Sequence, residues 1–380
     1  MQLPIYLDYA ASTPIDSRIL NAMLPYLSQQ TGFGNPSASH FYGREALQAI
    51  EKAREQVAAL IQAKPSEIIW TSGATEANNL AIKGIAYANK AKGKHIITAQ
   101  SEHSSVLDTC KQLEQEGFTI TYLQPEPSGI ITLEKLKAAI KKDTILISIM
   151  HINNEIGVMQ DIAAIGRVTR QHSIYFHVDA VQSAGKVKIN VTELPVDLMS
   201  FSAHKIYGPK GIGALYINQQ QKINLQPLFN GGGQEQNLRP GTLATHQIIG
   251  MGEAFAIAKQ DMPKDVEHIA AMKNHLWQGI EMLGEIHING QPDAPHILNV
   301  AFCRIESKLL LPALKDLAIA TGSACHAPSR EASHVLRSIG LSNETAQSSI
   351  RFSLGRFTTE AEINHAIEKI HMAVKLLRTN

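Results

Sequence analysis

Hydrophobic and polar positions follow two alternating patterns over the middle of the chain, from about residue 68 to residue 218. Short runs of aliphatic and β-branched residues are separated by longer stretches in which apolar residues recur every three or four positions. The short runs predict seven strands: Ile68–Thr71, His95–Ala99, Thr119–Leu123, Thr144–Met150, Ile174–Val178, Leu198–Ser202 and Gly213–Ile217. Because strands alternate with helices, we expect an α/β fold whose largely parallel sheet is covered by helices on both faces.

Two of the intervening helices can be placed from individual residues. Val106, Leu107, Cys110 and Leu113 recur at the spacing of one helix face. Thr132 precedes a second periodic stretch, and threonine commonly caps a helix by accepting a backbone hydrogen bond. The pattern therefore predicts one helix around residues 106–113 and another that begins after Thr132.

The last third of the chain has a different pattern, with longer helical stretches. Pro263, Pro292 and Pro295 are expected in the connections between elements, because proline interrupts a helix. His296–Phe302 is typical of a strand, and Glu360–Leu377 is typical of an amphipathic closing helix. This part of the chain therefore predicts an α+β arrangement.

Length and hydrophobic content limit the number of domains. The chain has 380 residues, 44% of them hydrophobic, which is enough for two cores. The change of pattern near residue 260 predicts a large domain over residues 15–260. Residues 1–14 and 261–380 are expected to form a smaller domain.

Charge and cysteine content exclude several classes of protein. The formal net charge is +1, which gives no electrostatic case for direct binding to nucleic acid or to an anionic membrane. Three cysteines without a CxxC pair make no disulfide framework, and the sixteen histidines form no motif typical of a resident metal. No signal peptide or apolar run of ~18 residues is present, so we expect a cytoplasmic protein.

Two candidate catalytic residues stand at the ends of consecutive strands. Asp179 follows Ile174–Val178, and Lys205 follows Leu198–Ser202. Ligands of parallel sheets bind at the carboxyl ends of strands, so the two side chains can converge on one ring. There a carboxylate can keep a heteroaromatic nitrogen protonated, as pyridoxal phosphate requires. The alternatives are a helix-capping aspartate and a solvated lysine in a loop.

Other strand ends carry polar groups at the same expected edge of the sheet. Thr71–Glu76 opens a helix, and Gly73 and Thr75 would help its backbone N–H groups to bind a phosphate. His103 follows the next strand, where a histidine can stack on a planar ring or relay protons. Asn153–Gly157 follows a further strand. Taken singly, these are also common loop residues that bind nothing.

Cys325 is the candidate sulfur nucleophile. It lies in the stretch of small residues Ala320–His326, whereas Cys110 and Cys303 fit the alternative role of buried, inert thiols. The residues around Cys325 cannot form a packed element. We therefore expect a mobile loop over roughly residues 321–333 that carries the thiol.

These motifs together resemble the class V, fold-type I pyridoxal-phosphate enzymes, and most closely the cysteine desulfurases of the IscS/NifS group. The resemblance covers nearly the whole chain, in the order and at nearly the spacing of the family. The matching motifs are Leu7–Ala10, Thr71–Glu76, His151–Gly157, His177–Ala180, Ser202–Gly208, Gly322–Cys325 and Arg351–Thr358. The resemblance implies a mostly parallel seven-stranded sheet with a smaller α+β domain.

The resemblance also implies a role for each site residue. Lys205 would form the Schiff base with pyridoxal 5'-phosphate, Asp179 would pair with the ring nitrogen and Gln182 with the ring hydroxyl. His103 would stack on the ring and carry protons, and Asn154 would lie against the cofactor. Residues expected to bind the phosphate are Ala74, Thr75, Ser202, His204 and, from the partner subunit of a homodimer, Thr242. Residues expected to bind the substrate carboxylate are Arg351 and Asn35.

The implied activity is removal of sulfur from L-cysteine, which gives L-alanine and a persulfide on Cys325. An acceptor protein, either an iron–sulfur scaffold or a thiolation protein, would then take the sulfur, and Cys325 is open to transient ligation of an iron–sulfur cluster. His326-Ala327-Pro328 departs from the small hydroxyl residues usual in the group, and the chain ends at Asn380 without its scaffold-docking tail. The acceptor therefore stays open. The alternatives are an aminotransferase or selenocysteine lyase on the same scaffold, and a non-catalytic sulfur carrier.

Overall fold

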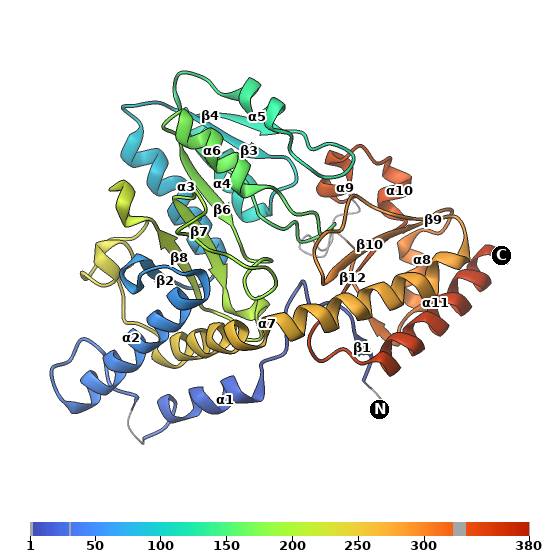
Figure 1. The fold of residues 1–380 in the computed structure, drawn as a ribbon, viewed down its shortest axis with the longest axis horizontal. Coiled ribbons are helices and arrows are strands. Elements are labelled where there is room, and N and C mark those ends of the chain that lie inside the picture. Colours follow the sequence, from blue (N-terminus) through green and yellow to red (C-terminus); the bar gives the residue numbers. More distant parts are fainter. Residues whose placement is uncertain (1–2, 30–31, 322–331, 380) are drawn as a thin grey trace.

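The computed structural model describes residues 3–29, 32–321 and 332–379. Cys325 and most of the predicted thiol-carrying loop lie outside the described residues. The described chain is built around a seven-stranded sheet in the order β2-β8-β7-β6-β5-β3-β4 (Figure 1). The strands are β2 (Ile68–Thr71), β3 (His95–Ala99), β4 (Thr119–Leu123), β5 (Thr144–Ser148), β6 (Tyr175–Asp179), β7 (Leu198–Ser202) and β8 (Gly213–Ile217).

The sheet is mostly parallel, as predicted. Strands β4, β3, β5, β6 and β7 pair in parallel, and β8 runs antiparallel to both of its neighbours, β7 and β2. Three strand bounds differ from the prediction, since β5 ends at Ser148 and β6 runs from Tyr175 to Asp179. Asp179 is therefore the last residue of β6 rather than the residue after it.

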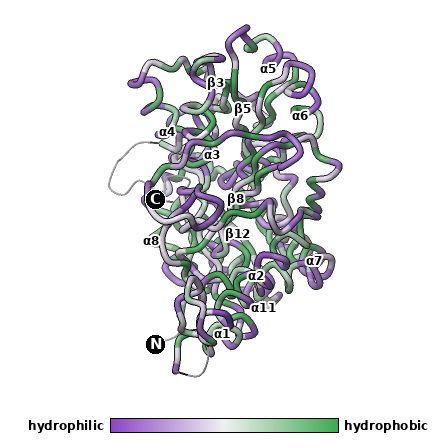
Figure 2. The backbone as a smooth tube through the Cα atoms, turned by 90° about the vertical axis from the view of Figure 1, so that its left-hand side faces the viewer, coloured by the Kyte–Doolittle hydropathy of each residue, from purple (hydrophilic) through white to green (hydrophobic). Residues whose placement is uncertain are grey.

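Helices cover both faces of this sheet because alternate strand residues point to opposite sides. Ile96 and Leu146 pack in the cluster beneath α3 and α4, whereas Ile97 and Ile147 pack in the cluster on the other face. The helices of this part are α1 (Ser17–Met23), α2 (Phe41–Ile61), α3 (Ala74–Asn89), α4 (Ser104–Gln115), α5 (Leu133–Ala139) and α6 (Ile162–Gln171). Figure 2 shows hydrophobic positions along interior strands such as β8 and hydrophilic ones along peripheral segments.

A second core lies beside the first, around a three-stranded antiparallel sheet in the order β12-β10-β9. Its elements are β9 (Ile286–Ile288), β10 (Ile297–Phe302), β12 (Ser349–Ser353), α8 (Ser307–Ala313) and α11 (Glu360–Thr379), whereas α9 (His334–Ser338) and α10 (Asn343–Gln347) pack in a small separate cluster with Ile156 and Val158. The N-terminal strand β1 (Ile5–Tyr6) joins this side by pairing in parallel with β11 (Leu317–Ala318). This arrangement supports the α+β arrangement predicted for the last third of the chain.

One long helix, α7 (Thr245–Ile280), contributes to both cores (Figure 1). Its first half packs in the core beside the large sheet, and Leu276 and Ile280 pack in the second core. Residue 260 lies inside this helix, so the predicted domain division stays a prediction. The expectation that Pro263 lies in a connection is wrong, because it lies within α7. Packing at both ends of the helix offsets the loss of the backbone hydrogen bond that proline cannot donate.

The helices predicted from single residues are confirmed. Thr132 caps α5 by accepting a hydrogen bond from the Lys135 backbone N–H, at 3.3 Å. Cys110 is fully buried in α4, whereas Cys303 is half-buried just beyond β10, so the expectation of a buried thiol there is only partly met. Among the described residues, no helix is both long and apolar enough to cross a membrane.

Candidate active site

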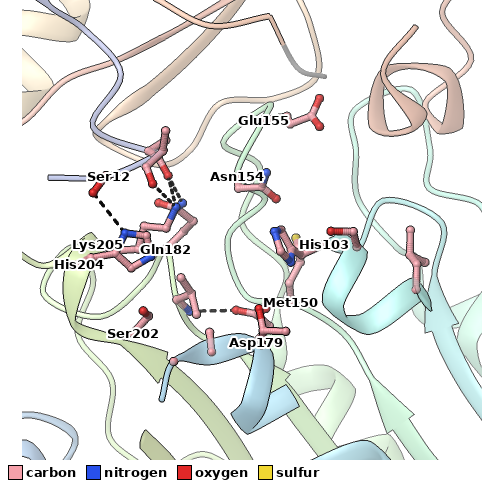
Figure 3. Close-up of a pocket in the computed structure, with 18 of the residues that line it drawn as sticks. Ser12, His103, Met150, Asn154, Glu155, Asp179, Gln182, Ser202, His204 and Lys205 are labelled. Carbon is pink, nitrogen blue, oxygen red and sulfur yellow. Dashed lines mark hydrogen bonds between the residues drawn. The ribbon is translucent and has the colours of Figure 1, made fainter. Parts of the chain in front are cut away.

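A cavity of about 760 Å³ opens at the carboxyl ends of the central strands (Figure 3). This volume is in the range of small-molecule sites. Ten of the residues predicted from the sequence line it: Ala74, Thr75, His103, Asn154, Asp179, Gln182, Ser202, His204, Lys205 and Arg351. The sequence therefore placed most of the candidate residues in one pocket.

Two predicted residues do not line this cavity. Asn35 is exposed, and its side-chain oxygen accepts a hydrogen bond from the Ser37 backbone N–H at 3.0 Å. Thr242 is exposed in the segment that precedes α7. Within one chain, neither side chain reaches the pocket.

Lys205 projects from the short helical turn Ala203–Lys205 that follows β7. Its Nζ donates hydrogen bonds to the backbone carbonyls of Ala10 and Ala11, at 2.6 and 2.7 Å. Those carbonyls are held in place because the Ala10 backbone N–H donates to the Ser353 hydroxyl in β12. The N-terminal segment therefore spans from the second core to the amine.

Asp179 presents its carboxylate from the end of β6 into the same cavity (Figure 3). The Val181 backbone N–H donates to its Oδ1 at 3.0 Å, and the Asn78 side chain donates to its Oδ2 at 2.8 Å. Both carboxylate oxygens are thus fixed by N–H donors. The group is oriented before any ligand arrives.

The turn before α3 forms one end of the cavity. Gly73 is the N-cap of this helix and has no side chain to cap it, and the first turn of the helix lines the cavity, so its backbone N–H groups are available to a ligand. A Cβ on Gly73 would meet nothing within 4 Å. At Gly213, by contrast, a Cβ would lie 2.7 Å from Gly73 Cα, so a glycine in β8 lets the turn approach the sheet.

This end of the cavity is electropositive. Burial and then the charges of Lys205, Lys210 and Lys186 lower the pKa of His204 to about 4. The same charges would attract an anion beside the N-terminus of α3. Donors and charge together suit a phosphate group.

Arg351 lies in β12, on the opposite side of the cavity from the sheet. Its Nη1 donates to the Asn154 carbonyl at 2.7 Å, and its Nη2 donates to the Asp8 carboxylate at 2.6 Å. The guanidinium is nearly buried, and its Nε has no hydrogen-bond partner among the described residues. A substrate carboxylate could compete with Asp8 for this planar group.

Several residues of the site were missed by the sequence reasoning. The backbone carbonyls of Ala10 and Ala11 could not be recognised from the sequence, because every residue type has a carbonyl. Glu155 lines the cavity and accepts a hydrogen bond from the Ser333 hydroxyl, and burial raises its pKa to about 7. Lys186 is buried under Lys205, where it donates to that residue's carbonyl at 2.8 Å, and burial lowers its pKa to about 7. From the sequence alone, a glutamate or a lysine in a loop is expected to be exposed, so the burial of Glu155 and Lys186 could not be predicted.

The residues present fit pyridoxal phosphate. The cavity offers a primary amine, a fixed carboxylate and an electropositive helix terminus, which suit an aldehyde, a pyridine nitrogen and a phosphate. The side-chain oxygen of Asn154 is buried and has no hydrogen-bond partner in the part of the chain that the structure describes, so a donor on a bound group could satisfy it. Across the described residues, no group of three or more His, Cys, Asp or Glu side chains is arranged to hold a metal ion.

The chain belongs to the class-V aminotransferase family, whose profile it matches over residues 5–365. It is 56% identical to a protein of Vibrio campbellii named "Cysteine desulfurase IscS", over 100% of this chain and 94% of that protein. It is equally similar, at 56% identity and with the same coverage, to the protein of that name from Photorhabdus laumondii.

Solved structures agree with this assignment. A structure described as "NIFS-LIKE PROTEIN" matches with a TM-score of 0.92 and 35% identity, covering 98% of this chain and 100% of that one. Another, "SspA in complex with cysteine", matches with a TM-score of 0.83 and 41% identity, covering 93% and 100%. The predicted fold class is therefore confirmed.

Proposed function

We propose that this chain is a pyridoxal-phosphate-dependent cysteine desulfurase, which converts L-cysteine to L-alanine and transfers the sulfur to an acceptor. The carrying observation is that the Lys205 amine and the Asp179 carboxylate line one cavity, in a chain whose full-length relatives are named cysteine desulfurases. When bound, the cofactor supplies an electron sink that stabilises negative charge at the substrate Cα.

Each side chain of the cavity then has a definite task. Asp179 would keep the pyridine nitrogen protonated, while Ala74, Thr75, Ser202 and His204 would hold the phosphate. Lys205 Nζ would remove the Cα proton. Its position against the Ala10 and Ala11 carbonyls supports this role, since an amine with fixed acceptors is oriented for proton transfer.

Arg351 binds the substrate carboxylate and so fixes which face of Cα meets the amine. Its two Nη atoms are held by Asp8 and by the Asn154 carbonyl, which sets the plane of the guanidinium. Gln182 would pair with the ring hydroxyl, and the hydrogen bond of 2.9 Å that its amide donates to the Ala10 carbonyl supports this role by fixing the side chain. Asn154 would lie against the cofactor.

Cys325 is the proposed nucleophile, and it lies outside the described residues. Its thiolate attacks the substrate sulfur, so a sulfur–sulfur bond forms and the Cβ–S bond breaks. The electron pair of the broken bond stays with the three-carbon skeleton, which takes up protons and leaves as alanine. Cys325 keeps the sulfur as a persulfide for an acceptor protein, either an iron–sulfur scaffold or a thiolation protein, in the reducing cytoplasm.

The active unit is proposed to be a homodimer, in which Thr242 reaches the phosphate site of the partner. Thr242 is exposed and does not line the cavity of its own chain, which supports this arrangement. Large hydrophobic side chains are also exposed along one N-terminal segment: Leu20, Leu24, Leu27, Phe33, Phe41, Tyr42 and Leu47. A segment this apolar is typical of a protein interface. Asn35 lies in it and is proposed to act across the same interface.

The test is incubation with L-cysteine and a reductant, with alanine and sulfide measured together. Equal amounts of both are expected from the wild type, and none from Lys205→Ala. Cys325→Ser should lose sulfide release, whereas the matched control Cys303→Ser should keep it. Sulfide release by Cys325→Ser at the wild-type rate would exclude the thiol mechanism, and keto-acid formation instead of sulfide would indicate an aminotransferase.

A further inference from the structure

His103 is held against the first turn of α4 through one ring nitrogen. It is the N-cap of this helix, and its Nδ1 accepts a hydrogen bond from the Ser105 backbone N–H at 3.1 Å. A backbone N–H can only donate, so the Nδ1 lone pair is occupied. A neutral ring in this position carries its proton on Nε2.

A second donor reaches the same nitrogen. The Ser105 hydroxyl lies 2.9 Å from His103 Nδ1, and the Asn78 amide nitrogen lies 2.9 Å from that hydroxyl. Since Asn78 donates to the hydroxyl oxygen, the hydroxyl proton is directed to the imidazole. Nδ1 therefore accepts from both groups of Ser105.

The orientation of the Asn78 amide is fixed by Asp179. The same Asn78 nitrogen donates to Asp179 Oδ2 at 2.8 Å, so both amide hydrogens are used. A flipped amide would turn its oxygen toward the carboxylate, which is electrostatically unfavourable. The amide oxygen is buried without a partner in the described structure, as expected if the two donor contacts decide the orientation.

We propose that Asn78 and Ser105 are positioning residues that hold His103 in the neutral Nε2–H tautomer, so that the ring meets the cavity as a hydrogen-bond donor and not as a base. The chain of contacts runs from the Asp179 carboxylate through Asn78 and Ser105 to Nδ1. Burial lowers the pKa of His103, and although the Asp179 carboxylate acts to raise it, the charges of Lys205 and His334 lower it further, in agreement with a neutral ring.

The consequence for turnover rests on the proposed function. An Nε2–H imidazole cannot accept a proton from substrate at Nε2, and a proton on Nδ1 would face the Ser105 N–H. Proton removal from Cα is therefore left to Lys205. His103 would stack on the ring and donate one hydrogen bond, in place of the proton-carrying role that the family resemblance implied.

Solid-state nitrogen NMR of the holoenzyme, labelled in its histidine rings, tests the proposal without any measurement of turnover. The His103 signals are those lost in His103→Gln. Expected are a protonated Nε2 and an unprotonated Nδ1. A protonated Nδ1, or a fully protonated ring at neutral pH, would overturn the proposal.

Variants test the two positioning residues. In Ser105→Ala the Nδ1 signal should move downfield, because one of its two donors is lost, and Asn78→Ala should give a smaller shift of the same sign. Thr109→Val is the matched control, since Thr109 is a buried hydroxyl on the same helix that donates to the Ser105 carbonyl and not to His103. Signals unchanged in Ser105→Ala would refute the role of its hydroxyl, and circular dichroism checks folding. Should alanine formation fail while the tautomer is as expected, the proposed function is wrong and this inference stands.

Discussion

His177 predicts a measurable acid sensitivity of the fold. Its ring lies in the middle of the sheet, fully buried, with Nδ1 2.9 Å from the Ser148 hydroxyl in β5 and Nε2 2.9 Å from the Ser200 hydroxyl in β7. Burial lowers its pKa from 6.5 to about 3. Below pH 6.5 the unfolded chain therefore binds a proton that the folded chain does not, and stability falls as the pH falls.

The size of the effect follows from these two values. Between about pH 8 and pH 5, a group with a pKa of 6.5 unfolded and about 3 folded lowers the free energy of unfolding by about 2 kcal/mol. His177→Gln keeps a polar side chain but cannot be protonated. Its free energy of unfolding should therefore fall by about 2 kcal/mol less than that of the wild type over this range.

Urea unfolding of the holoenzyme at several pH values and one protein concentration measures this difference. Other buried histidines contribute equally to both proteins and cancel in the comparison. His287→Gln is the control, because this histidine is exposed in β9 and should leave the pH dependence as in the wild type. Parallel curves for the wild type and His177→Gln would refute the assignment of acid sensitivity to His177.

Three further predictions concern the site and its support. Arg351→Lys should raise the KM for L-cysteine roughly 10- to 100-fold with a smaller effect on kcat, because a point charge replaces a planar donor pair worth about 1.5–3 kcal/mol. An unchanged KM in steady-state assays would contradict the binding of the substrate carboxylate by Arg351. Glu235→Gln should lower the free energy of unfolding by about 3 kcal/mol, since Glu235 is buried and accepts two hydrogen bonds of 2.8 Å from Arg54. A decrease of less than about 1 kcal/mol, measured by urea unfolding, would show that the fold does not depend on this ion pair. Phosphate binding to the cofactor-free protein near pH 5.5 should raise the pKa of His204 from about 4, so the wild type should take up more protons on binding than His204→Asn does. Calorimetry in buffers of different ionisation enthalpy measures this uptake, and equal uptake by both proteins would place the anion elsewhere.

The sequence predicted the strands well because buried parallel strands are nearly continuous apolar runs, such as His95–Ala99. It also placed Asp179 and Lys205 in one cavity, since strand ends meet at one edge of a sheet. It failed at Pro263, where tertiary packing outweighs a local preference. Glu155 could be recognised only as part of a motif, because its contact with Ser333, which is distant in the sequence, forms only in the folded chain.

The contacts of the Lys205 amine with the Ala10 and Ala11 carbonyls limit what mutagenesis can reveal. Every amino acid has a carbonyl, so no codon change at either position deletes these acceptors. A scan of single substitutions would score both positions as tolerant so long as the replacement fits. Only an ester linkage, a deletion or an insertion near the start of the chain would expose how much the enzyme depends on them.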